Sequence, residues 1–353
     1  MKQTIVGWDI GGAHLKAVMI EPTGNVIKVV QIACPLWRGL DMLELAIDEA
    51  LVKFNHYNPK THAITMTGEL ADIFLNRHEG VLQIIHLIHT KLKGTKHYYA
   101  GQLGFMEFGQ VVENTTKIAS ANWIASATFI AQQHSQALFI DMGSTTTDLM
   151  LIVDHKLNCR GFDDAMRMQY EELVYTGMIR TPLMAVASKV PFTGDWCNVA
   201  AENFATMGDV YRLTGDLTDS QDISDTADGR SKTLIDSARR LARMIGHDVE
   251  DADMTAWIAL AQVFKQMQLH ALKKAVMRQL SRLASFDQKA LLNEDSPIIG
   301  AGVGVEIVKA LAQQLNQPFF YARDMICANS LAEKNWVSIC FPAYSVANLV
   351  INS

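Results

Sequence analysis

Two short segments of the 353-residue chain each place an aspartate at the end of an apolar run, with small residues directly after it. Residues 9–16 read DIGGAHLK, and residues 141–148 read DMGSTTTD. Glycine lets backbone N–H groups approach an anion closely, and a nearby carboxylate can hold Mg²⁺ directly or through water. Each segment therefore predicts a turn that binds phosphate and a metal ion. A plain β-hairpin turn is the alternative for one copy alone, but two copies in matching positions favour a binding site.

The residue types within the two turns suggest separate roles. Asp9 and Asp141 are the candidate metal ligands, and Lys16 is a candidate phosphate contact. Hydroxyl side chains in the second turn replace some glycines of the first as hydrogen-bond donors. The candidate phosphate-binding residues are Gly11, Gly12, His14, Gly143, Ser144, Thr145 and Thr146.

A third glycine-rich segment, residues 298–306, reads IIGAGVGVE. It places Gly300, Gly302 and Gly304 between a predicted strand and a predicted helix. Such a turn suits the ribose or phosphate of a nucleotide, or another elongated anion. The same glycines could instead allow the strand and the helix to pack closely. Their position after both aspartate turns favours the binding role.

Hydrophobic periodicity and turn residues predict the elements that position these segments. Apolar runs predict strands at 5–9, 15–20, 26–32, 63–67, 137–141, 147–153, 297–299 and 318–321. Helix-spaced apolar residues predict helices at 40–54, 71–89, 232–246, 254–286, 303–315 and 342–352. The aspartate-ended strand, its turn and the returning strand occur twice, which indicates an internal duplication.

We therefore expect an α/β protein built from two duplicated domains, each with a mixed sheet flanked by helices. The first domain would comprise residues 1–116 together with a C-terminal helix at about 342–353. The second would comprise residues 117–341 and carry an insertion at about 155–235. Oligomeric state stays open, and a homo-oligomer is one option, because the sequence contains no coiled-coil heptads.

Composition excludes several classes of protein. Hydrophobic residues make up 49% of the chain and charged residues 19%, as in a folded globular protein. The formal charge of -6, from 31 basic and 37 acidic residues, argues against a nucleic-acid binder. Five scattered cysteines form no CxxC pair, so we expect neither a disulfide framework nor a cysteine zinc site. Without a targeting segment or a membrane-length apolar run, we expect a cytoplasmic protein that does not bind membranes.

One acidic segment stands out from this composition. Residues 216–228 place an aspartate at every third position, and no Lys or Arg occurs between 213 and 229. Alternate spacing, which an EF-hand loop requires, is absent. We expect a solvated loop here, with a lid over a binding cleft as the alternative.

Several motifs occur together with the aspartate turn at 141–148. They are TMTGELAD at 65–72, SANW at 120–123, AENFAT at 201–206, TADGR at 226–230 and RLARM at 240–244. The combination resembles the hydantoinase/oxoprolinase-like family that is linked to tetrahydromethanopterin-dependent one-carbon transfer. This family lies within the actin/sugar-kinase/Hsp70 (ASKHA) superfamily, whose two duplicated, ribonuclease H-like domains close over a cleft. The resemblance extends from about residue 4 to residue 350.

The resemblance implies an activity, because archaeal relatives are similar to the condensing enzyme of methanofuran biosynthesis. That transferase joins an aminomethylfuran-methyl diphosphate (a furfuryl diphosphate) to the phenol of a glutamyl-tyramine and releases diphosphate. The resemblance thus implies small-molecule substrates: this diphosphate, and a phenolic amine or amino acid such as tyramine or tyrosine. The product would be the aryl ether of methanofuran or methylofuran.

The resemblance also implies roles for individual residues. Asp9 and Asp141 would organise Mg²⁺, and the two turns would hold diphosphate. Lys16 and Arg230 would add positive charge to the diphosphate site. Gly300, Gly302 and Gly304 would add backbone contacts to the ligand. The candidate general bases are Asp148, Glu69 and His14, although helix capping is an alternative role for Glu69. His14 stands where we expect asparagine in this family.

Two other activities fit the same phosphate turns. An ATP-dependent kinase or a hydantoinase-like hydrolase would bind nucleotide phosphates where the condensing enzyme binds diphosphate. A nucleotide-binding scaffold without turnover would use the turns for ligand-dependent domain closure alone.

Overall fold

The computed structural model describes residues 4–54, 57–286 and 296–353. Contacts between residues divide the chain into two compact units. The first unit contains Met1–Ala137, Ile152–Asn158 and Phe320–Ser353, and the second contains Leu138–Leu151 and Cys159–Phe319. This division places residues 117–137 and 320–341 in the first unit, whereas the sequence assigns them to the second domain. The domain boundaries therefore stay a prediction.

The first unit contains a six-stranded mixed sheet in the order β3-β2-β1-β4-β5-β6. Strand β1 pairs antiparallel with β2 and parallel with β4. The strands are β1 (Ile5–Ile10), β2 (His14–Ile20), β3 (Val26–Ala33), β4 (Thr61–Met66), β5 (Thr95–Tyr99) and β6 (Phe105–Met106). The predicted strands at 5–9, 15–20, 26–32 and 63–67 are confirmed to within two residues at each end.

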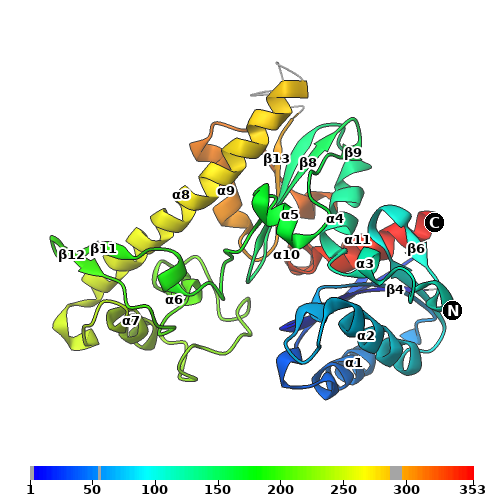
Figure 1. Ribbon diagram of the computed structural model, residues 1–353, viewed down its shortest axis with the longest axis horizontal. Coiled ribbons are helices and arrows are strands. Elements are labelled where there is room, and N and C mark those ends of the chain that lie inside the picture. Colours follow the sequence, from blue (N-terminus) through cyan, green and yellow to red (C-terminus); the bar gives the residue numbers. More distant parts are fainter. Residues whose placement is uncertain (1–3, 55–56, 287–295) are drawn as a thin grey trace. The chain divides into compact units, whose positions relative to one another are not determined.

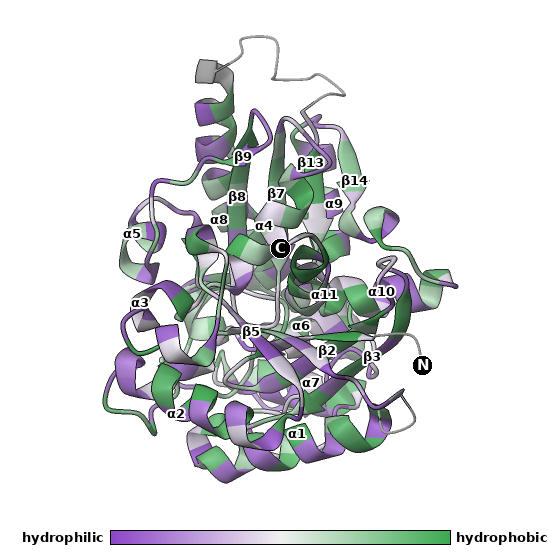
Figure 2. Ribbon diagram, turned by 90° about the vertical axis from the view of Figure 1, so that its right-hand side faces the viewer, coloured by the Kyte–Doolittle hydropathy of each residue, from purple (hydrophilic) through white to green (hydrophobic). Residues whose placement is uncertain are grey.

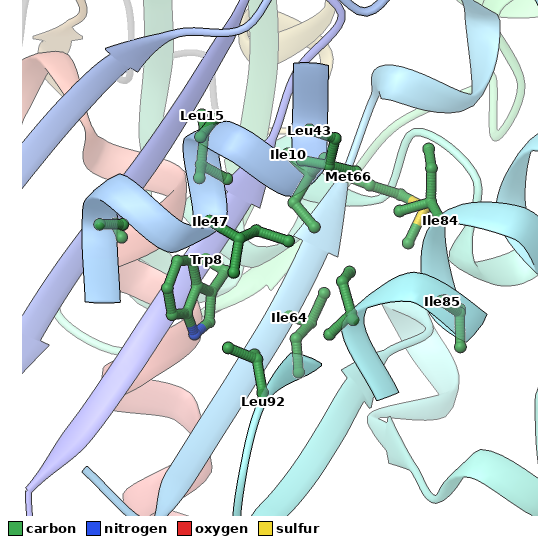
Figure 3. Packing of buried hydrophobic residues seen from close by; sticks show 14 of the residues in the cluster. Trp8, Ile10, Leu15, Leu43, Ile47, Ile64, Met66, Ile84, Ile85 and Leu92 are labelled. Carbon is green, nitrogen blue, oxygen red and sulfur yellow. The ribbon is translucent and has the colours of Figure 1, made fainter. Parts of the chain in front are cut away.

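Helices cover both faces of this sheet. Helices α1 (Leu40–Phe54) and α2 (Arg77–Lys91) pack on one face, where the Trp8 ring meets the edge of Phe54 at 6.1 Å. Consecutive strand residues point to opposite faces, and Gly7 accordingly lies against Ala343 of α11 (Phe341–Leu349) on the other face. Figure 1 shows the helices and strands of this unit, and Figure 3 shows the apolar packing around Trp8 between the sheet, α1 and α2.

The second sheet has the order β10-β8-β7-β13-β14, with β9 (Lys156–Leu157) paired to β8. Its strands are β7 (Ala137–Met142), β8 (Thr147–Val153), β10 (Leu173–Val174), β13 (Ile298–Ala301) and β14 (Phe319–Tyr321). As in the first sheet, the outer strand β10 is antiparallel to its neighbour, and β13 is parallel to β7. The shared strand order confirms the α/β class with two duplicated mixed sheets flanked by helices.

Hydrophobic periodicity predicts the bounds of α1 and α8 (Met254–Phe286), whereas α2 begins at a side-chain cap that periodicity does not reveal. Helix α1 and the long helix α8 have the predicted bounds of 40–54 and 254–286. The helix predicted at 71–89 begins instead at Arg77, because the Asn76 side chain accepts the Glu79 N–H at 2.9 Å and caps it there. In Figure 2, α1 and α2 show hydrophobic and hydrophilic residues side by side, as expected for helices with one face on a core.

The remaining elements include several that periodicity did not predict. Helices α7 (Leu234–Arg243) and α9 (Val305–Gln314) are shorter than the helices predicted at 232–246 and 303–315, and α11 lies within the predicted 342–352 except for its first residue. The other elements are α3 (Thr115–Ile118), α4 (Asn122–Ala131), α5 (Asp164–Gln169), β11 (Lys189–Phe192), β12 (Asp195–Asn198), α6 (Met207–Leu213), α7 (Leu234–Arg243), α9 (Val305–Gln314) and α10 (Leu331–Ile339). Within the described parts of the chain, no helix combines the length and apolar content that crossing a membrane would require.

Candidate functional site

The first aspartate turn connects β1 to β2. The Gly11 N–H donates to the His14 carbonyl at 3.0 Å, and a Cβ on Gly11 would lie 3.0 Å from that oxygen. Asp9 is buried, with 5% of its surface exposed, and is in register with Lys16 of β2. Residues directly opposite each other in antiparallel strands point to the same face of a sheet. The turn therefore presents the carboxylate and the ammonium group together.

The second aspartate turn connects β7 to β8 with the same geometry. The Gly143 N–H donates to the Thr146 carbonyl at 2.9 Å, which reproduces the Gly11 contact with identical spacing from the aspartate. Asp141 is in register with Ala301 of the parallel strand β13, as Asp9 is with Thr65 of β4. The two candidate metal ligands thus occupy equivalent positions in the duplicated sheets.

Gly302 is the member of the third glycine segment that contacts an aspartate. A Cβ at this position would collide with Asp141 Oδ1, and its φ of 86° is one that glycine adopts readily. A Cβ on Gly300 would lie 2.8 Å from the Phe319 ring, and one on Gly304 would meet the Met142 side chain. Close packing, the alternative interpretation, therefore accounts for glycine at 300 and 304.

A 3-10 turn at Gly68–Leu70 lies against the first aspartate turn. The Thr67 N–H donates to the Ile10 carbonyl at 2.9 Å, and a Cβ on Gly68 would lie 3.1 Å from the same oxygen. The next residue, Glu69, is almost fully buried, and Ser120 Oγ donates to its Oε1 at 2.7 Å. This candidate base is therefore held at the carboxyl end of β4, beside the turn that carries Gly11.

Ser120 is a residue of the site that sequence reasoning missed. It lies in the SANW motif, which was the only available signal, because Glu69 is 51 positions away in the chain. Its φ of 50° is in the left-handed region, which costs a non-glycine residue about 1 kcal/mol or more. The fold maintains this strained backbone where the hydroxyl meets the carboxylate.

Residues 176–181 pack against the second aspartate turn and form hydrogen bonds to its backbone. The Met178 N–H donates to the Gly143 carbonyl at 2.9 Å, and the Arg180 N–H donates to the Ser144 carbonyl at 2.8 Å. Gly177 packs so closely that a Cβ would lie 2.7 Å from the Thr145 nitrogen. These contacts fix the backbone of the turn, as a preformed anion site requires. Nothing in the sequence pattern indicated this segment.

Asp148, another candidate base, is part of an ion pair. Arg167 Nη2 lies 2.8 Å from Asp148 Oδ1, and the Arg167 side chain is 2% exposed. Burial raises the pKa of Asp148, and the nearby Arg167 charge opposes that rise. Arg167 also donates to the Glu172 carbonyl at 3.0 Å. The pair joins β8 to α5 and the following turn.

Arg230, expected to add charge to the phosphate site, has a side chain that is 59% exposed, and its Nε lies 4.0 Å from Asp228 Oδ2. Its backbone N–H donates to Asp228 Oδ1 at 3.1 Å. Asp228 accepts a further hydrogen bond from the buried Arg240 at 3.0 Å. The structure therefore anchors this motif to α7, and the phosphate role of Arg230 stays a prediction.

The expectation that residues 216–228 form a solvated loop is wrong for three of its aspartates. Asp222 is buried and pairs with Arg212 at 2.6 Å, and Asp216 pairs with Lys265 at 2.6 Å. Asp228 pairs with Arg240. All three cations lie outside the segment in which Lys and Arg are absent, so local composition did not reveal them.

The carboxylates of the aspartate turns are of the kind that binds Mg²⁺ together with waters and phosphates, and they do not form a closed structural metal site. Across residues 4–54, 57–286 and 296–353, no three His, Cys, Asp or Glu side chains are grouped to hold a metal ion. Mg²⁺ usually binds through one or two carboxylates together with waters and substrate phosphates. Each aspartate turn supplies one carboxylate of this kind, Asp9 in the first unit and Asp141 in the second, whereas a closed structural site of protein ligands would need more donors.

Comparison with known proteins gives a family, one relative that matches nearly the whole chain and one that matches about two thirds of it. Residues 60–332 match the hydantoinase/oxoprolinase family. A Methanocaldococcus jannaschii protein named (4-{4-[2-(gamma-L-glutamylamino)ethyl]phenoxymethyl}furan-2-yl)methanamine synthase is 29% identical over 99% of this chain and 98% of its own. A Methanococcus vannielii protein with the same name is 28% identical over 64% of this chain and 96% of its own.

Solved structures with a similar overall course of the chain are more distant in sequence. A ROK family glucokinase from Streptomyces griseus, in complex with glucose and AMPPNP, has a TM-score of 0.47 and 14% identity over 98% of both chains. The activator of 2-hydroxyisocaproyl-CoA dehydratase from Clostridium difficile has a TM-score of 0.43 and 10% identity over 99% of this chain and 95% of its own.

Proposed function

The chain belongs to the hydantoinase/oxoprolinase family, and on this premise we propose that it is a synthase that joins an aminomethylfuran to a phenolic γ-glutamyl amide. The observation that carries the proposal is the match along 99% of the chain to a synthase whose name describes that ether. The pathway would be the biosynthesis of methanofuran or methylofuran, which supports tetrahydromethanopterin-linked one-carbon transfer.

The proposed reaction forms one C–O bond and breaks another. The phenol oxygen attacks the exocyclic carbon of an aminomethylfuran-methyl diphosphate, and diphosphate leaves with the electron pair of the broken bond. The electron-rich furan stabilises positive charge at that carbon. The phenol proton passes to a base on the protein. No ATP is consumed.

The duplicated turns suit the leaving group in this reaction. The backbone at 11–14 and at 143–146 would bind diphosphate, and Lys16, opposite Asp9, would neutralise part of its charge. Asp9 and Asp141 would hold Mg²⁺, which when bound supplies further charge neutralisation for a diphosphate leaving group. The rigid contacts of residues 176–181 support this role, because a preorganised site loses little energy on rearrangement.

Glu69 is the candidate base that we favour. Its carboxylate is buried beside the first aspartate turn and is oriented by Ser120. Asp148 is engaged by Arg167, so proton transfer to it would disturb a buried ion pair. His14, which is 8% exposed, is the alternative at the first turn.

The test is to incubate the purified protein with Mg²⁺, the furfuryl diphosphate and γ-glutamyl-tyramine, and to measure diphosphate and the ether product. Both should appear in equal amounts without ATP. Parallel reactions with tyramine and with tyrosine identify the acceptor. ATP hydrolysis without ether would favour the kinase or hydrolase, and ligand-dependent closure without any product would favour the scaffold.

A further inference from the structure

Residues 176 and 177 of the second unit are held by side chains of a strand and of a helix. Thr147 of β8, the strand that follows the second aspartate turn, donates from its hydroxyl to the Thr176 carbonyl at 2.6 Å. Gln268 of α8 donates from Nε2 to the Thr176 hydroxyl at 2.7 Å and to the Gly177 carbonyl at 2.9 Å. All of these groups are buried, and hydrogen bonds are stronger in the interior than in water. Gly177 in turn packs against the aspartate turn, because a Cβ there would lie 2.7 Å from the Thr145 nitrogen.

A buried phenol fixes the orientation of the Gln268 amide. Tyr211 of α6 donates its hydroxyl hydrogen to Gln268 Oε1 at 2.5 Å, and Figure 1 shows α6 beside α8. Burial raises the pKa of Tyr211, so the phenol keeps its proton and remains a donor. A carbonyl only accepts, so the nitrogen of the amide must face Gly177 and its oxygen must face Tyr211. Both amide hydrogens and the amide oxygen of Gln268 are thus engaged.

The restrained segment also determines where the N–H groups of the aspartate turn point. The N–H groups of residues 178 and 179 donate to the Gly143 and Ser144 carbonyls at 2.9 and 3.0 Å. A planar trans peptide directs its N–H opposite to its carbonyl. The N–H groups of Ser144 and Thr145 therefore point away from the restrained segment, and both residues are partly exposed there to an anion. Fixing the two carbonyls fixes the direction of these donors.

Gln279, on the same helix, makes an equivalent set of contacts to a different segment. Its Nε2 donates to the Tyr170 and Glu171 carbonyls at 2.8 and 3.2 Å, and its Oε1 accepts from Arg282 Nη1 at 2.8 Å. It follows Gln268 by 11 residues, about three helical turns, so both lie on the same face of α8. Both glutamines are almost fully buried. Of the two, Gln268 contacts the segment that holds the aspartate turn.

We propose that Gln268 and Tyr211 are positioning residues for diphosphate binding, because they hold residues 176–177 so that the N–H groups of Ser144 and Thr145 stay directed at the leaving group. The proposal rests on the proposed function and names the side chains that preorganise its anion site in the second unit. A loosened turn would bind diphosphate less tightly. It would also stabilise less of the charge that develops on this group in the transition state.

The test compares Gln268→Met with Gln279→Met in the full chain. Methionine has a side chain of similar length but no N–H donor, so each change removes three hydrogen bonds. Gln268→Met should raise the Kd of inorganic diphosphate, measured calorimetrically with Mg²⁺, about tenfold. It should lower kcat of ether formation about tenfold and leave the KM for γ-glutamyl-tyramine unchanged. Gln279→Met should leave the Kd of diphosphate unchanged, although it lowers the free energy of unfolding by a similar amount.

Tyr211→Phe is a milder variant that keeps the aromatic ring, so it serves as the test if Gln268→Met does not fold. It removes one hydrogen bond to the amide and should raise the Kd of diphosphate about threefold. Combining it with Gln268→Met should cause no further increase, because both residues act through the same amide.

The outcomes separate the positioning role from the reaction. An unchanged Kd of diphosphate in Gln268→Met and Tyr211→Phe, or an equal increase in Gln279→Met, would overturn the positioning role. Ether formation by the wild type would leave the proposed function intact in either case. Conversely, a wild type that forms no ether but binds diphosphate in a manner that Gln268→Met weakens would overturn the proposed function and support the positioning role.

Discussion

Ser120 Oγ donates to the Glu69 carboxylate at 2.7 Å while its own backbone is held at a φ of 50°. Ser120→Gly removes this hydrogen bond to a buried carboxylate, which lowers the free energy of unfolding. Glycine adopts the backbone without strain, which offsets part of that loss, so the net decrease should be about 1 kcal/mol.

If Ser120 positions Glu69 for proton transfer, Ser120→Gly should lower kcat about 10- to 100-fold with little change in KM. Glu69→Gln should lower kcat by about 100-fold or more. Initial rates of diphosphate release, together with denaturant unfolding, measure both effects. Ser126→Ala, on the neighbouring helix α4, is the control and should keep wild-type kcat. A loss of several kcal/mol in the free energy of unfolding alongside the kcat loss would assign Ser120 a structural role only.

Asp9→Asn and Asp141→Asn should each abolish ether formation, because each removes one of two equivalent carboxylates that would hold Mg²⁺. Asparagine keeps the shape of the side chain, so the melting temperature should change little. Binding of diphosphate measured calorimetrically, with and without Mg²⁺, gives a readout that does not depend on turnover. The Mg²⁺-dependent increase in affinity should vanish in both variants, whereas Asp195→Asn on the surface should retain it. Near-normal turnover in both variants would remove the metal assignment.

His62 makes the stability of the first unit depend on pH. Trp8 Nε1 donates to His62 Nδ1 at 3.1 Å, while the other ring nitrogen lies 3.1 Å from the Lys93 carbonyl. An indole only donates and a carbonyl only accepts, so these contacts require the neutral imidazole. Burial lowers the pKa of His62 from 6.5 to about 4.

A lowered histidine pKa means that the unfolded chain binds more protons than the folded one between about pH 4 and 6.5. The contribution of His62 is therefore complete above pH 6.5 and declines as the pH falls toward 4, by about 3 kcal/mol in total. Unfolding of wild type and of His62→Gln is followed by tryptophan fluorescence at several pH values. The difference between their free energies of unfolding isolates the contribution of His62. A difference that does not change with pH would contradict the prediction.

Adjacent arginines on α7 provide a matched pair for the buried ionic network. Arg240 is fully buried and contacts Asp209 at 2.7 Å and Asp228 at 3.0 Å. Arg239 pairs with the partly exposed Asp236. Arg240→Met would leave Asp209 buried with Arg212 alone, at a cost of about 3 kcal/mol in the free energy of unfolding. Arg239→Met should cost about 1 kcal/mol or less. Equal costs in denaturant unfolding would show that the network contributes no more than a surface pair.

Features encoded within a few residues were predictable from sequence. The duplicated aspartate turns depend on the spacing of Asp and Gly, and the structure reproduces that spacing as matching hydrogen bonds at Gly11 and Gly143. Helices α1 and α8 follow from apolar periodicity, which extends over their full length.

Features that depend on partners far away in the chain were not predictable. The Ser120–Glu69 contact, the ion pairs of the acidic segment and the support of residues 176–181 all join separate segments. Such contacts leave no periodic pattern. The start of α2 was missed for a local reason, because the side-chain cap at Asn76 outweighed the apolar spacing before it.

The contact of Gly7 with Ala343 has a consequence for synthesis on the ribosome. Strand β1 is made some 330 residues before the helix that covers this face of its sheet. Until α11 arrives, nascent chains carry the first sheet with an apolar face uncovered, a condition that promotes aggregation. The first unit can therefore be completed only after the second unit has been translated, and its early strands depend on protection until then.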